Sequence, residues 1–130
     1  TMSTFQRFTD IEAWQKAREL TCEIYRVSNR GMFSKDFGLR RQIRDASVSV
    51  RSNIAEGFDR NGTAEFVQFM AIAKGSVAEV ASQLYVAMDQ KYVSAAEFDQ
   101  LIALANETGQ KIGALMNYLR KLGIKGVKFR

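Results

Sequence analysis

No proline occurs in this 130-residue chain, and that absence limits its possible folds more than any other feature of the sequence. Proline ends or kinks helices and is common in loops, so a chain without it favours long, uninterrupted helices. Apolar residues recur at three- and four-residue spacing in four segments, which are separated by polar or glycine-bearing breaks. We expect helices over about residues 10–30, 35–60, 63–91 and 94–122, with a basic tail over 123–130.

Four amphipathic helices joined by short connections predict an all-α fold in one domain spanning residues 1–130. The expected architecture is an antiparallel up-down-up-down four-helix bundle. A three-helix core with a swung-out fourth helix is the alternative, but the fourth segment carries the cleanest apolar stripe and so favours the bundle. The expected capping residues are Thr9 or Asp10, Ser34, Thr63, and Ser94 with Glu97 in a capping box; Gly123 is the expected stop of the last helix.

Histidine is also absent from the chain. Its absence removes the commonest general base, the commonest zinc ligand, and every Ser-His or Cys-His nucleophilic site. The sequence has no glycine-rich phosphate-binding loop, and its single cysteine, Cys22, cannot close a disulfide within the chain. We therefore expect a protein that is not an enzyme and that uses no cofactor, metal or small-molecule substrate. No apolar run reaches the length of about 18 residues needed to span a membrane, so we expect a cytoplasmic protein with no membrane partner.

Positive charge collects in two parts of the chain, whose net charge is +5. No acidic residue follows Glu107, and residues 40–51 of the second expected helix hold a cluster of four arginines relieved only by Asp45. The candidate nucleic-acid-binding residues are Arg40, Arg41, Arg44, Arg51, Arg120, Lys121, Lys125, Lys128 and Arg130. Such runs of charge are more often simply solvated, and the sequence shows no aromatic-rich stacking platform beside these cations.

Residues 49–60, SVRSNIAEGFDR, place several polar side chains on one side of the second expected helix. Asn53, Glu56 and Arg60 share that side, and they either form a ligand site or clasp a neighbouring helix through paired polar groups. The clasp is the more economical interpretation. We expect Asn53 and Glu56 to hydrogen-bond across a close contact at Gly75 and Ser76, and Gly57 to loosen the end of the second helix.

The same stretch resembles a known family. Residues 49–58, SVRSNIAEGF, are similar to the S-[IV]-x-x-N-I-A-E-G-[FY] signature of the four-helix-bundle proteins encoded in intervening sequences of bacterial 23S rRNA genes. Residues 8–17 (FTDIEAWQKA), residues 37–44 (FGLRRQIR) and residues 72–76 (IAKGS) resemble further family motifs, in the expected order. The resemblance covers about residues 5–92, and Arg51 stands where the family often has proline.

The resemblance implies a compact antiparallel bundle that assembles as a homopentamer, a ring around a central channel. It also implies a distant similarity to the accessory variability protein of diversity-generating retroelements, which has the same pentameric shape and a basic, nucleic-acid-binding surface. No enzymatic activity follows from it.

Two functions remain open on these grounds. The first is a non-catalytic scaffold that binds RNA or DNA through its basic patches. The second is a structural or protein-interaction oligomer with no nucleic-acid ligand, in which complementary charge and spare apolar residues join like subunits. The spare apolar residues are Leu20 and Val27 in the first expected helix and Val67, Ile72 and Val86 in the third.

Overall fold

Four long helices make up the fold in this computed structural model, which describes residues 5–60 and 62–124. They are α1 (Glu12–Ser28), α2 (Phe37–Phe58), α3 (Thr63–Asp89) and α4 (Ala95–Ile124). Two single-turn 3-10 helices, η2 (Phe8–Asp10) and η3 (Phe33–Lys35), lead into α1 and α2. No strand is found within the described ranges, so the prediction of an all-α fold is confirmed.

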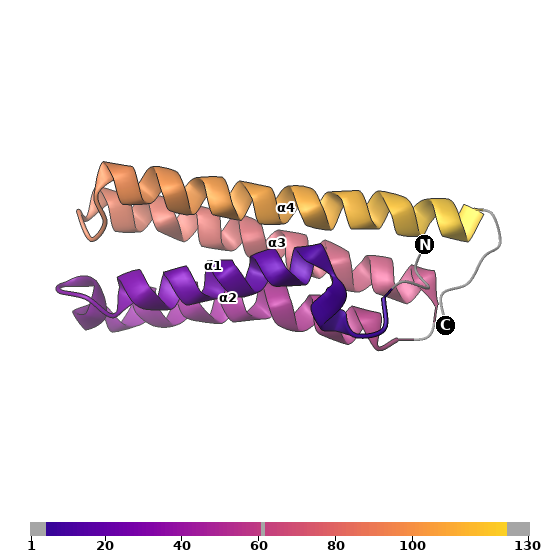
Figure 1. Ribbon diagram of the computed structural model, residues 1–130. Helices are drawn as coiled ribbons and strands as arrows, with labels where there is room; N and C mark the ends of the chain where they lie inside the picture. The colour runs from indigo at the N-terminus through magenta and orange to yellow at the C-terminus, as the bar shows by residue number, and fades with distance from the viewer. Residues whose placement is uncertain (1–4, 61, 125–130) are drawn as a thin grey trace.

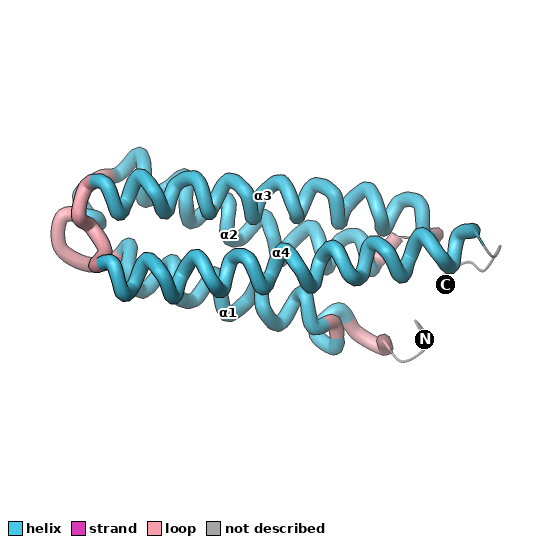
Figure 2. The backbone as a smooth tube through the Cα atoms, turned by 90° about the horizontal axis from the view of Figure 1, so that it is seen from above, coloured by secondary structure: helices cyan, strands magenta, loops and turns pink. Residues whose placement is uncertain are grey.

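The four helices form an antiparallel bundle in which consecutive helices are joined at alternate ends (Figure 1). Helix α1 packs on α2, α2 on α3, α3 on α4, and α4 returns to α1. Figure 2 shows the same arrangement from above, with α4 lying along the bundle for its whole length. The alternative with a swung-out fourth helix is therefore wrong, and α4 lies diagonally opposite α2.

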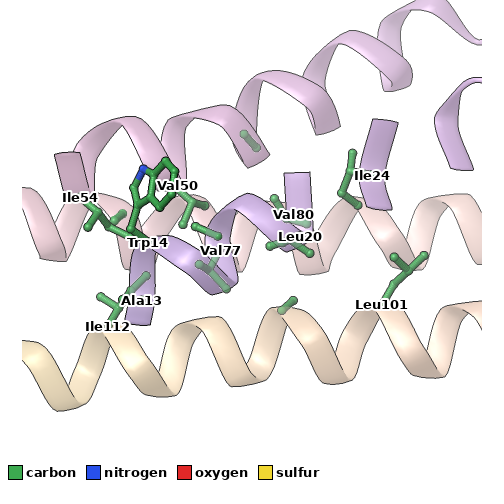
Figure 3. Packing of buried hydrophobic residues seen from close by; sticks show 14 of the residues in the cluster. Ala13, Trp14, Leu20, Ile24, Val50, Ile54, Val77, Val80, Leu101 and Ile112 are labelled. Carbon is green, nitrogen blue, oxygen red and sulfur yellow. The ribbon is translucent and has the colours of Figure 1, made fainter. Parts of the chain in front are cut away.

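The core fills the space between the helices with the apolar stripes that the sequence predicts. Leu20, Val50, Val77 and Ile112, one from each helix, point into the space between the helices in Figure 3, and all are buried. Leu20 and Val27 are fully buried in this core, which contradicts the expectation that they form a spare strip on the first helix. They lie inside because the buried stripe of α1 is wide enough to face α2 and α4 at once.

The side-chain caps expected for the first two helices are wrong. Helix α2 is capped by Asp36, whose Oδ1 accepts a hydrogen bond from the backbone N–H of Leu39 at 3.2 Å. Ser34 instead lies in η3, the turn that carries the buried Phe33 into the core. Helix α1 follows Ile11 without a side-chain cap, because Asp10 accepts hydrogen bonds from the backbone N–H groups of Gln6 and Arg7.

Of the boundaries expected for the last two helices, one is confirmed and two are wrong. Gly62 precedes α3 with φ of 109°, a conformation that favours glycine, so Thr63 is the first helical residue and not the cap. The capping box at the start of α4 is confirmed, since Ser94 and Glu97 each accept a hydrogen bond from the other's backbone N–H at 3.1 Å. Gly123 does not stop α4, which continues to Ile124. No helix among the described residues combines the length and apolar character needed to cross a membrane.

Candidate nucleic-acid interface

Three arginines of α2 each lie over an aromatic ring, and two of these rings belong to α1. The Arg44 Cζ is 4.5 Å from the centroid of the Tyr25 ring, and the Arg51 Cζ is 5.2 Å from that of Trp14, so both contacts join α2 to α1. Arg40 lies over Phe37, one turn earlier in its own helix, at 5.2 Å. Cation–π attraction therefore holds each guanidinium close to an apolar surface.

Hydrogen bonds to neighbouring segments also hold two of these guanidinium groups. Arg44 donates through Nε to the Ser28 Oγ at 2.8 Å, and Arg40 donates through Nη1 to the Ser34 carbonyl oxygen at 2.8 Å. A guanidinium has five N–H donors, so each of these arginines retains donors for an external ligand. Because a ring and a hydrogen bond hold each of these two side chains, ordering them on a ligand costs little conformational entropy.

We call this feature the arginine–aromatic strip; its members are Trp14, Arg18, Tyr25, Phe37, Arg40, Arg44 and Arg51. Arg18 belongs to it because its Cζ lies 5.8 Å from the Trp14 centroid. The expectation that no aromatic platform accompanies the cations is wrong. The i, i+4 spacing of Trp14 and Arg18 was visible in the sequence, but only the packing of α1 on α2 brings Tyr25 beside Arg44.

None of the ion pairs within the described residues involves an arginine of the strip. Glu12 pairs with Lys111 at 3.0 Å and Glu107 with Lys16 at 3.3 Å, which neutralises charge along the seam between α1 and α4. The hydrogen bond to Glu107 raises the pKa of Lys16. Within the described residues, none of the four α2 arginines singled out by the sequence, including the exposed Arg41, forms an ion pair.

The second basic cluster lies in a different part of the bundle. Arg120 and Lys121 are exposed on α4, diagonally opposite α2, so the structure does not bring them together with the arginine–aromatic strip. Arg120 borders a groove of about 520 Å³ between the start of α3 and the end of α4, lined mainly by Ala64, Val67 and Leu119. Lys125, Lys128 and Arg130 lie outside the described residues.

Polar residues of the stretch 49–60 form part of a clasp between α2 and α3. The hydroxyl groups of Ser49 and Ser76 are 2.9 Å apart, which confirms Ser76 as a contact. Asn53 does not cross to α3: its Nδ2 donates to the carbonyl oxygen and the hydroxyl of Ser49, at 2.8 and 3.1 Å. It thereby orients the side chain that does cross.

Of the other two side chains of that stretch, Arg60 reaches α3 and Glu56 does not. Glu56 is exposed and lies 3.8 Å from Arg60 in an ion pair within the same segment, so the expected bond from Glu56 to α3 is wrong. The Arg60 Cζ lies 5.0 Å from the centroid of the Phe69 ring. Within the described part of the chain, no group of three or more Cys, Asp or Glu side chains is arranged to hold a metal ion.

The close approach of α2 and α3 occurs at Gly57 and not at Gly75. A Cβ placed on Gly57 would lie 2.8 Å from the Phe69 Cβ and 3.0 Å from the Phe66 Cδ1. A Cβ on Gly75 would meet nothing within 4 Å. Gly57 also does not loosen its helix, since it is buried and α2 continues to Phe58.

The chain is similar to a known protein family and to a solved structure. Residues 9–114 match the family described as 23S rRNA-intervening sequence protein. Among curated proteins none matches. The crystal structure of a protein of unknown function from the S23 ribosomal protein family of Bacteroides thetaiotaomicron VPI-5482 is similar, with a TM-score of 0.73 and 19% identity over 80% of this chain and 97% of that one. At that identity the likeness concerns the fold alone, whereas the family match spans most of the sequence and agrees with the motifs at residues 8–17, 37–44 and 49–58. The chain belongs to the 23S rRNA-intervening sequence protein family.

Proposed function

We propose that this protein is a non-catalytic helical-bundle scaffold that binds nucleic acid in the cytoplasm through the arginine–aromatic strip. The observation that carries the proposal is the combination of unpaired charge and fixed geometry in Arg40, Arg44 and Arg51. Surface arginines usually find an acidic partner or move freely in water. These side chains are held over aromatic rings, and no described acid lies within ion-pair distance of them.

Binding of this kind depends on phosphate charge. Arginines that contact phosphates release the condensed counterions of the nucleic acid, so affinity falls steeply as salt rises. Contacts to phosphates position a protein on its ligand but carry no sequence information. We therefore expect recognition by charge and shape. The exposed basic residues of α4, Arg120 and Lys121, and the candidate residues beyond the described range would contribute a second, separate patch.

We further propose that the protein works as a homo-oligomer, with the homopentameric ring that its family resemblance implies. Helix α3 supports this proposal because Ile72, Tyr85 and Val86 remain exposed on it, with Ile72 at 53%. Exposed apolar residues that gather on one helix of a bundle are typical of contacts with another chain. Five copies would repeat the strip five times, and the contributions of their phosphate contacts to the affinity would add up.

The test is binding of labelled RNA and duplex DNA, measured by fluorescence polarisation over a series of salt concentrations. We expect the double variant Arg40→Gln, Arg44→Gln to weaken binding and to lower the slope of log affinity against log salt by roughly 1.5 to 2, about one ion per lost contact. Deletion of residues 125–130 tests Lys125, Lys128 and Arg130 in the same way, and Arg120→Gln with Lys121→Gln tests the patch on α4.

The matched control is Lys74→Gln with Lys91→Gln, which removes the same charge from exposed positions outside both patches. If this control lowers affinity as much as the α2 variant, binding follows net charge alone and the strip is not the site. If the unmodified protein binds no nucleic acid at low salt, the proposed function is wrong.

The exposed apolar surface of α3 favours a second function, a structural or protein-interaction oligomer with no nucleic-acid ligand. In that case the α2 arginines would meet acids of a neighbouring subunit. The two functions separate in the same assay, because the second predicts an oligomer that retains its mass and binds no RNA or DNA at any salt concentration.

A further inference from the structure

Two aromatic residues of the arginine–aromatic strip remain exposed to solvent. Phe37 is 67% exposed at the first turn of α2, and Tyr25 is 43% exposed on α1. A phenylalanine exposed to this degree adds little to the core, since only buried apolar area stabilises the fold appreciably. Met32, also exposed, lies in the connection between these two helices.

Each exposed ring is paired with a guanidinium that the fold holds in place. Arg40 lies over Phe37 and is tied to Ser34, while Arg44 lies over Tyr25 and is tied to Ser28. In two successive turns of α2, a guanidinium therefore lies over one face of an exposed ring, and the part of the ring that remains exposed adjoins a fixed positive charge. A planar base can stack on such a surface while the neighbouring phosphate takes the remaining N–H donors.

We infer that the ligand of the strip is single-stranded nucleic acid, with unpaired bases stacked on Phe37 and Tyr25 and phosphates bound by Arg40 and Arg44. In a duplex the bases are stacked on one another and cannot reach a protein ring, so only the cations would act on it. This inference rests on the proposed function, and it adds that rings as well as charge select the ligand.

The experiment uses a fluorescent oligouridylate of roughly a dozen nucleotides and the same strand paired with its complement. Polarisation is measured with the full chain at fixed salt. We expect the single strand to bind more tightly than the duplex. Phe37→Leu should weaken single-strand binding roughly tenfold and leave duplex binding unchanged, because a stacked base is lost while every cation remains. Tyr25→Leu should act in the same direction.

The conservative variants Phe37→Tyr and Tyr25→Phe are the controls, since they keep a ring and should bind as the unmodified protein does. Fluorescence of Trp14, the only tryptophan, checks that every variant is folded. Equal loss of single-strand and duplex binding in Phe37→Leu, or no loss of either, overturns the inference while the proposed function stands. A change in the mass of the assembly at unchanged affinity assigns the rings to a contact between proteins and also overturns it.

Discussion

Glu97 joins two parts of the chain that are far apart in the sequence. Its carboxylate accepts two hydrogen bonds from the Arg30 guanidinium, at 2.8 and 2.9 Å, and one from the backbone N–H of Ser94. The bonds from Arg30, and then that from Ser94, lower the pKa of Glu97 from 4.5 to about 2. A carboxylate whose pKa is lower in the folded state stabilises the fold above its ordinary pKa and loses that effect as the pH falls.

This residue gives a pH-dependent prediction. Glu97→Gln keeps a side chain that can serve the capping box but removes the charge that Arg30 binds, so we expect a loss of about 1 kcal/mol in the free energy of unfolding at neutral pH. The difference from the unmodified protein should shrink as the pH falls from about 4.5 and be lost as the pH passes through about 2, where Glu97 takes up its proton in the folded state. Urea unfolding across this range measures it.

Asp99→Asn is the matched control for that experiment. Asp99 is an exposed acid two residues further along α4, and its carboxylate forms no ion pair within the described residues. Its replacement should leave the pH dependence of stability unchanged. A Glu97→Gln curve that stays parallel to that of the unmodified protein down to pH 2 would contradict the role assigned to Arg30.

At the scale of the helices, the contact of α2 with α3 depends on one glycine. Gly57→Ala would place a methyl group 2.8 Å from the Phe69 Cβ, an atom fixed to the backbone of α3, so the helices must move apart. We expect a net loss of roughly 1–2 kcal/mol, because overpacking outweighs the gain of about 1 kcal/mol in helix propensity. Gly75→Ala, with open space around its Cβ, should instead stabilise the chain by up to about 1 kcal/mol.

Urea unfolding of the two variants measures whether their free energies of unfolding change in opposite directions. Equal effects of Gly57→Ala and Gly75→Ala would show that the helix contact tolerates a side chain at Gly57. A loss of stability in Gly75→Ala that grows with protein concentration would instead place Gly75 in a contact between chains.

At the scale of the whole molecule, the exposed side of α3 predicts association. Light scattering should give a mass of about five times the 14.7 kDa of one chain, as the family resemblance implies. Ile72→Glu puts a charge into the proposed contact, so we expect it to lower that mass without unfolding the bundle, which circular dichroism can check. Val48→Glu, at an exposed valine of α2, is the control and should keep the mass. If light scattering gives the mass of a single chain for the unmodified protein, the proposed assembly is wrong.

Several features of the fold were predictable because they depend on local patterning. The three- and four-residue spacing of apolar side chains identifies four helices, since only one face of each helix can be buried. The capping box of Ser94 and Glu97 was predictable for the same reason, because its atoms lie within one turn. The start of α2 was not, since the buried Phe33 sets the path of the chain there and so makes Asp36 the cap in place of Ser34.

By itself, the sequence determined the all-α class, the order of the helices and the residues that carry positive charge, because these follow from composition and short-range spacing. Only the tertiary structure decided which helix faces meet. It placed Tyr25 of α1 beside Arg44 of α2, buried Leu20 and Val27, and put the close helix approach at Gly57 and not at Gly75. The rotation of one helix against its neighbour is set by how all the buried side chains pack together, and no single segment encodes that.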